Sequence, residues 1–72
     1  MKDKVVLVDG ENYKIFAEVD EQGTVTLWTD KLDRQQERWR FDEDSGGVML
    51  QASDAKKLLD FLMRHKERFS DG

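Results

Sequence analysis

Apolar and polar residues alternate along the first two thirds of the chain, which is typical of half-buried β-strands. The alternation predicts strands over residues 11–19, 24–29 and 37–42, and short β-branched or apolar runs predict two more over 4–8 and 48–52. Turn-forming pairs such as Asp9-Gly10 and Gly46-Gly47 separate them. Residues 30–36 are polar and lack a sustained period, so they are interpreted as a loop. The pattern predicts an antiparallel meander of four or five strands.

Residues 53–69 change to the three-and-four spacing of one helical face. Ser53 is the predicted N-cap, and Asp54 follows in the first turn, where a negative charge suits the helix dipole. The apolar stripe consists of Ala55, Leu58, Leu59, Leu62 and Phe69. The predicted fold is therefore α+β, a single domain over residues 1–72, with one C-terminal helix packed on one face of the sheet.

The apolar arc of this helix is broader than one sheet face requires, because Phe61 and His65 extend it on one flank. Phe61 either shields the edge of the helix or forms, with His65, an interface to a second subunit. A chain of 72 residues has a marginal core, and small domains usually add disulfides, a metal or oligomerisation. Cysteine is absent and histidine occurs once, so we expect a homodimer, with no metal and no cofactor.

The sequence carries no catalytic motif. His65 is the only imidazole and is interpreted as a partly exposed helix residue, and the carboxylates cluster in turns, where they are usually solvated. An enzyme is therefore not expected. No apolar run approaches membrane-spanning length and no secretory signal precedes the first strand, so no membrane contact is expected. The absence of cysteine fits a reducing compartment, which favours a cytoplasmic location.

The alternation also assigns side chains to the two sheet faces. The face toward the helix is predicted to carry Tyr13, Ile15, Ala17, Val25, Leu27, Trp39 and Phe41. The open face is predicted to carry Lys14, Phe16, Trp28, Arg38 and Arg40, with Lys31 and Arg34 in the adjoining loop. Rings interleaved with cations suit a single-stranded nucleic acid, because bases stack on the rings for about 1–3 kcal/mol each while the cations contact phosphates.

A second interpretation stays open beside this one. The net charge is −4, and the chain lacks the basic character of most nucleic-acid-binding proteins. Phe16 and Trp28 are equally explained as a cross-strand pair covered by a partner subunit. The chain would then be an acidic protein–protein interaction module, such as a small regulator or inhibitor, that does not bind nucleic acid.

The final strand leading into the helix, VMLQASDAKKLLDFL over residues 48–62, carries a family resemblance together with Trp28 and the RWR around Trp39. The order of elements resembles the single-stranded-DNA-binding domain of the transcriptional coactivator positive cofactor four, and is similar to the PUR repeat of purine-rich-element-binding proteins. This resemblance implies a homodimer that binds single strands on its sheet and has no enzymatic activity. The chain departs from the family in its acidity and in the additional strand at residues 4–8.

Overall fold

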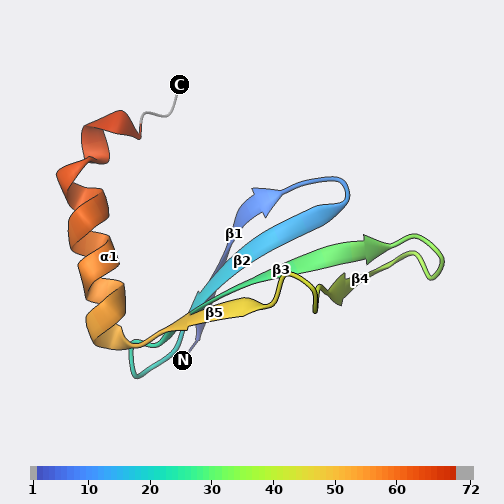
Figure 1. The fold of residues 1–72 in the computed structure, drawn as a ribbon, viewed down its shortest axis with the longest axis horizontal. Helices are drawn as coiled ribbons and strands as arrows, with labels where there is room; N and C mark the ends of the chain where they lie inside the picture. Colours follow the sequence, from blue (N-terminus) through green and yellow to red (C-terminus); the bar gives the residue numbers. More distant parts are fainter. Residues whose placement is uncertain (1, 70–72) are drawn as a thin grey trace.

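The computed structural model describes residues 2–69 and shows an antiparallel sheet followed by one helix (Figure 1). The strands are β1 (Asp3–Asp9), β2 (Tyr13–Val19), β3 (Val25–Asp33), β4 (Arg38–Phe41) and β5 (Gly47–Leu50). The helix α1 (Ala52–Arg64) and a short 3₁₀ turn (Lys66–Arg68) complete the chain. The predicted α+β class, with a five-stranded antiparallel sheet and a C-terminal helix, is confirmed.

Strands β1 to β4 pair in chain order, and β5 also pairs with β3. β4 pairs with residues 30–33 of β3, and β5 pairs with residues 25–28 on the same side of that strand. The turn between β4 and β5 therefore interrupts a single sheet edge. The sheet is four strands wide, with β1 at the opposite edge.

β3 is longer than the alternation predicts, because residues 30–33 continue the strand and do not form a loop. Leu32 is the only aliphatic residue in this part of the strand, so it produces no detectable period. Its backbone N–H nevertheless donates to a carbonyl in the β1–β2 connection at 2.9 Å. The strand ends at Asp33, whose carboxylate accepts hydrogen bonds from the N–H groups of Gln35 and Gln36 and thereby turns the chain.

The register of the extended β3 decides which side chains share a face, because directly opposed residues project to the same side. The aliphatic face consists of Asp3, Val5, Val8, Tyr13, Ile15, Ala17, Val19, Val25, Leu27, Thr29, Lys31, Asp33, Arg38, Arg40, Val48 and Leu50. The aromatic face consists of Lys4, Val6, Asp9, Lys14, Phe16, Glu18, Thr26, Trp28, Asp30, Leu32, Trp39, Phe41, Gly47 and Met49. Trp39 opposes Leu32 and Phe41 opposes Asp30, so the prediction that these two rings face the helix side with Leu27 is wrong.

The edge strand β1 contains a β-bulge. Its pairing with β2 is regular from Asp3 to Val6, shifts, and resumes where Val8 opposes Ile15. Leu7 is left without an opposed residue and is exposed. A bulge of this kind bends the strand and increases its local twist.

Helix α1 begins at Ala52, directly after the N-cap residue Gln51. Gln51 has extended dihedrals and makes no side-chain capping hydrogen bond. The prediction of Ser53 as N-cap is wrong, because β5 runs into the helix through one residue and Ser53 already lies in the first turn. Asp54 in that turn and Arg64 in the last turn agree with the helix dipole.

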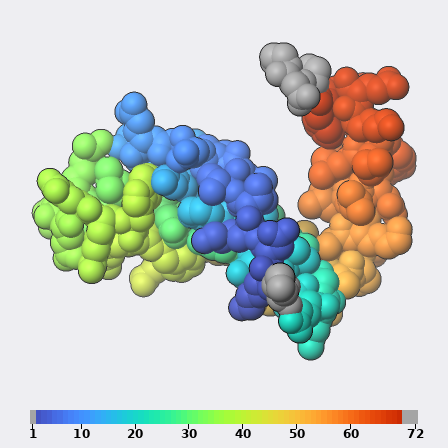
Figure 2. Space-filling view, turned by 180° about the vertical axis from the view of Figure 1, so that it is seen from behind, coloured from blue at the N-terminus to red at the C-terminus, as the bar shows by residue number. Residues whose placement is uncertain are grey.

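The helix stands away from the sheet and does not cover it (Figures 1 and 2). Leu58, Leu59 and Leu62 of its apolar stripe are 42%, 56% and 39% exposed. Within residues 2–69 no side chain is buried. The packing of α1 on its own sheet, expected from the sequence, is therefore not found. Sheet and helix form the two arms of an open V that meet where β5 ends.

The base of α1 rests against the turn between β2 and β3. Gly23 in this turn has a φ of +85°, and a Cβ placed there would lie 3.0 Å from the Cβ of Ala52. The carboxylate of Asp20 closes the turn by accepting hydrogen bonds from the N–H groups of Gln22 and Thr24, both at 2.9 Å. The backbone conformation and the close approach of the helix both require glycine here.

Comparing Gly23→Ala with Gly46→Ala is expected to reveal this contact in the free energy of unfolding. Both glycines have positive φ, so each alanine costs about 1–2 kcal/mol in backbone strain. A Cβ at Gly46 meets no atom within 4 Å, whereas one at Gly23 presses on Ala52. Urea denaturation should therefore show the larger loss for Gly23→Ala. Equal losses would show that the helix base does not depend on the turn.

Candidate nucleic-acid interface

Four rings lie on the aromatic face and extend across β2, β3 and β4. Phe16 and Trp28 are directly opposed, and their rings stack with centroids 5.3 Å apart and planes 22° apart. Both side chains are half-buried. Trp39 and Phe41 on β4 are 37% and 51% exposed. The face therefore combines a stacked cross-strand pair with two more open rings.

Two lysines lie over these rings. The Nζ of Lys4 is 5.1 Å from the centroid of the Phe16 ring, and the Nζ of Lys14 is 4.6 Å from that of Trp39. Such cation–π contacts contribute about 0.5–1 kcal/mol at exposed sites. Lys14 Nζ also lies 3.5 Å from Asp9 Oδ1. An anion that approached the rings would therefore meet two ammonium groups already positioned beside them.

Arg38 and Arg40 do not share this face. The register opposes Arg38 to Asp33 and Arg40 to Lys31, which places all four residues on the aliphatic face. The prediction that the two arginines interleave with the aromatic rings is therefore wrong. It treats residues 30–36 as a loop, and a loop leaves open which way the next strand faces.

Besides Lys14, which pairs with Asp9, two of the predicted phosphate-binding cations form ion pairs within the chain. Arg40 Nη1 donates to Asp33 Oδ2 at 3.1 Å. Lys31 Nζ lies 3.7 Å from Asp42 Oδ1 and 4.0 Å from Asp44 Oδ2. These pairs are partly exposed, so each is weak, but each places a carboxylate where a phosphate would have to bind.

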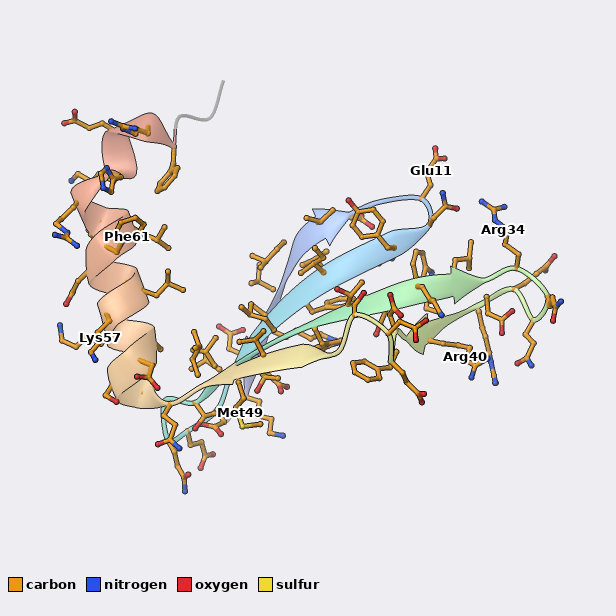
Figure 3. All side chains as sticks on the ribbon, viewed as in Figure 1. Glu11, Arg34, Arg40, Met49, Lys57 and Phe61 are labelled. Carbon is orange, nitrogen blue, oxygen red and sulfur yellow. The ribbon has the colours of Figure 1, made fainter. Side chains whose placement is uncertain are left out.

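Arg34 has a different role from the one expected for it. It lies in the turn between β3 and β4, and its guanidinium donates to Asn12 Oδ1 in the turn between β1 and β2. This contact connects the two turns at one end of the sheet. Figure 3 shows Arg34 at that end, far along the sheet from Met49 near the helix base.

Asp33 and Asp42, the carboxylates nearest to Arg40 and Lys31, are held in their charged form. The hydrogen bond from Arg40 lowers the pKa of Asp33 below its ordinary value of 3.8. The hydrogen bond from the Ser45 hydroxyl, at 2.7 Å, lowers the pKa of Asp42 in the same way. Both groups are therefore anionic at neutral pH, and the cations beside them remain paired.

On the helix, Phe61 and His65 contact each other. Their rings meet edge to face with centroids 5.0 Å apart, and the Arg64 guanidinium lies 5.8 Å from the Phe61 centroid. Phe61 is 49% exposed and shields no helix edge against the sheet of its own chain. The dimer-interface role of Phe61 and His65 stays a prediction.

Among residues 2–69 there is no cluster of three or more histidine, cysteine, aspartate or glutamate side chains suited to a metal ion. In the same described part, no helix is long and apolar enough to cross a membrane. No protein-family model, curated protein or solved structure matches this chain.

Proposed function

We propose that this chain is a non-enzymatic binding module that holds a single-stranded nucleic acid on its aromatic face. The observation that supports it is the set of four rings, Phe16, Trp28, Trp39 and Phe41, on one side of the sheet. Each base that stacks on such a ring gains about 1–3 kcal/mol, whatever its identity. The register gives this face two more rings than the sequence predicts for it.

Few cations lie on the aromatic face, so stacking dominates the proposed binding. Among residues 2–69, only Lys4 and Lys14 lie beside the rings, and Lys14 is also paired with Asp9. Lys31 and Arg40 project from the other face and are paired with carboxylates. A single strand releases about 0.7 counterions per phosphate neutralised, so two lysines give a log–log salt slope of about −1.4. The affinity should therefore fall only gently as salt rises.

Fluorescence titration tests the proposal directly. Both tryptophans of the chain lie on the aromatic face, so the tryptophan emission reports on that surface alone. Adding a short oligothymidylate should quench the emission, with a salt slope near the shallow value above, and a duplex of equal length should bind more weakly. The proposal is abandoned if single-stranded DNA and RNA at low salt leave both the emission and the strand amide resonances unchanged.

A second candidate is an acidic module that binds a basic protein surface. Asp42 and Asp44 line the turn between β4 and β5, and the Asp44 side chain is 96% exposed. The net charge of −4 favours encounter with a basic partner. If oligonucleotides have no effect, shifts of the amide resonances of this turn on adding a basic protein would support this candidate.

A further inference from the structure

The chain exposes more surface than a compact chain of its size. Its accessible surface is 6285 Å², whereas a compact monomer of 8.5 kDa exposes about 4,700 Å². Its Cα radius of gyration is 14.4 Å, against about 11 Å for a compact domain of this length. The excess of about 1,600 Å² reflects the open V, whose two arms leave their apolar surfaces uncovered.

On the sheet arm, the uncovered surface is the part of the aliphatic face nearest the helix base. A shallow hollow there is lined by the apolar residues Val5, Ala17, Val19 and Val25 together with Asp3, Lys4 and Glu18. It lies above Ala17, whose small side chain is flanked by larger ones on both neighbouring strands. Val48 borders this region and is 54% exposed. The hollow is mainly apolar, and its valines and alanine can receive a ridge of aliphatic side chains.

On the helix arm, the exposed ridge is the stripe of Leu58, Leu59 and Leu62. The helix has 13 residues, which makes it about 20 Å long. The seven residues of β2 span about 23 Å, and four strands span about 14 Å across the sheet. One helix therefore fits the aliphatic face in both dimensions.

The helix of the same chain is poorly placed to provide this cover. A single residue, Gln51, joins β5 to α1, so the connection is too short to let the helix fold back easily. Connections between strands and helices usually contain two to six residues. The base of the helix is also held against Gly23 through Ala52. Closing the V within one chain would break that contact.

We propose that a second copy of this chain fills the V, with α1 of each copy packing its leucine stripe on the aliphatic face of the other. Both chains then bury the same surfaces, as a twofold dimer requires. If each copy buries its excess surface, the interface totals about 3,200 Å², within the range of obligate homodimers. The aromatic face stays open, so this inference does not depend on nucleic-acid binding.

Mass and contacts between chains test the proposal on the unmodified protein. Light scattering after gel filtration should give about 17 kDa at micromolar concentration, twice the 8.5 kDa of one chain. In a sample of mixed labelled and unlabelled chains, isotope-filtered NOEs should connect Leu59 methyls of one copy with Val48 or Leu27 methyls of the other. A monomer mass, or interchain contacts between helices alone, would overturn the proposal.

Two neighbouring residues of β5 provide a matched pair of variants. Val48 lies on the aliphatic face and Met49 on the aromatic face, and both are exposed in the single chain. Figure 3 shows Met49 pointing away from the side on which the helix stands. Val48→Asp should raise the dimer dissociation constant about 100-fold or more, because it places an unpaired charge in an apolar interface. Met49→Asp should leave the mass unchanged, and dissociation caused equally by both variants would contradict the inference.

Discussion

Replacing Trp28 with alanine is expected to weaken single-stranded nucleic-acid binding by about 1–3 kcal/mol, or roughly 5- to 150-fold. The substitution removes one stacking surface and leaves Phe16 without its stacked partner. It removes no charge, so the salt slope should stay the same. Fluorescence anisotropy of a dye-labelled oligonucleotide measures both quantities, because it does not depend on the tryptophan signal.

The register of β4 extends this expectation to Trp39. Because Trp39 shares the aromatic face and carries Lys14 over its ring, Trp39→Ala should also reduce affinity by about 1–3 kcal/mol. Tyr13→Ala is the matched control, since Tyr13 is a half-exposed ring on the aliphatic face of the same sheet. If Tyr13→Ala weakens binding as much as Trp39→Ala, the ligand does not distinguish the two faces, and the assignment of binding to the aromatic face fails.

Replacing Leu27 with alanine is expected to lower the free energy of unfolding by about 2–5 kcal/mol. Leu27 lies at the centre of the aliphatic face between Ala17 and Val48, where the helix of a second copy would cover it. Thr26, the preceding residue, projects from the aromatic face, and Thr26→Ala should cost less than about 0.5 kcal/mol. Urea denaturation of the unmodified chain, Leu27→Ala and Thr26→Ala at one protein concentration provides the comparison.

The dependence of the urea unfolding transition on protein concentration is a second measurement. Folding coupled to dimer formation makes the urea midpoint rise with protein concentration. A side chain that is only half-buried within a single chain would instead lose well under 2 kcal/mol, because less of it leaves water. A small loss for Leu27→Ala with a concentration-independent midpoint would therefore show that no second copy covers the aliphatic face.

The fold class is predictable from the sequence because alternation and helical spacing are local signals. Phe16 and Trp28 could be placed on one face because each lies in a strand with a clear period. Trp39 could not, because its orientation depends on whether residues 30–33 form strand or loop. Those residues are mostly charged, and only their pairing with β4 makes them a strand. The charge of the aromatic face could not be predicted for the same reason, because the orientation of Arg40 follows from that of Trp39.

The helix shows a different limit. Its stripe of Leu58, Leu59 and Leu62 was correctly predicted to be one apolar face, because spacing alone defines it. Spacing does not say which surface covers that face. Ser53 similarly has the chemistry of an N-cap, but the length of β5 places the start of the helix before it. The boundary and the partner of the helix both depend on neighbours that a local pattern does not contain.

The bulge in β1 bears on how large an assembly can become. An exposed edge strand rich in valine and leucine can pair with the edge of another molecule and start open-ended growth into fibrils. In β1 the shift between Val6 and Val8 breaks the hydrogen-bonding order of that edge, and Asp3 and Asp9 place charges at its ends. Incoming strands would lose register after a few residues. Association through the faces of the sheet and helix is therefore favoured over strand pairing at the β1 edge. Such association ends once those faces are covered.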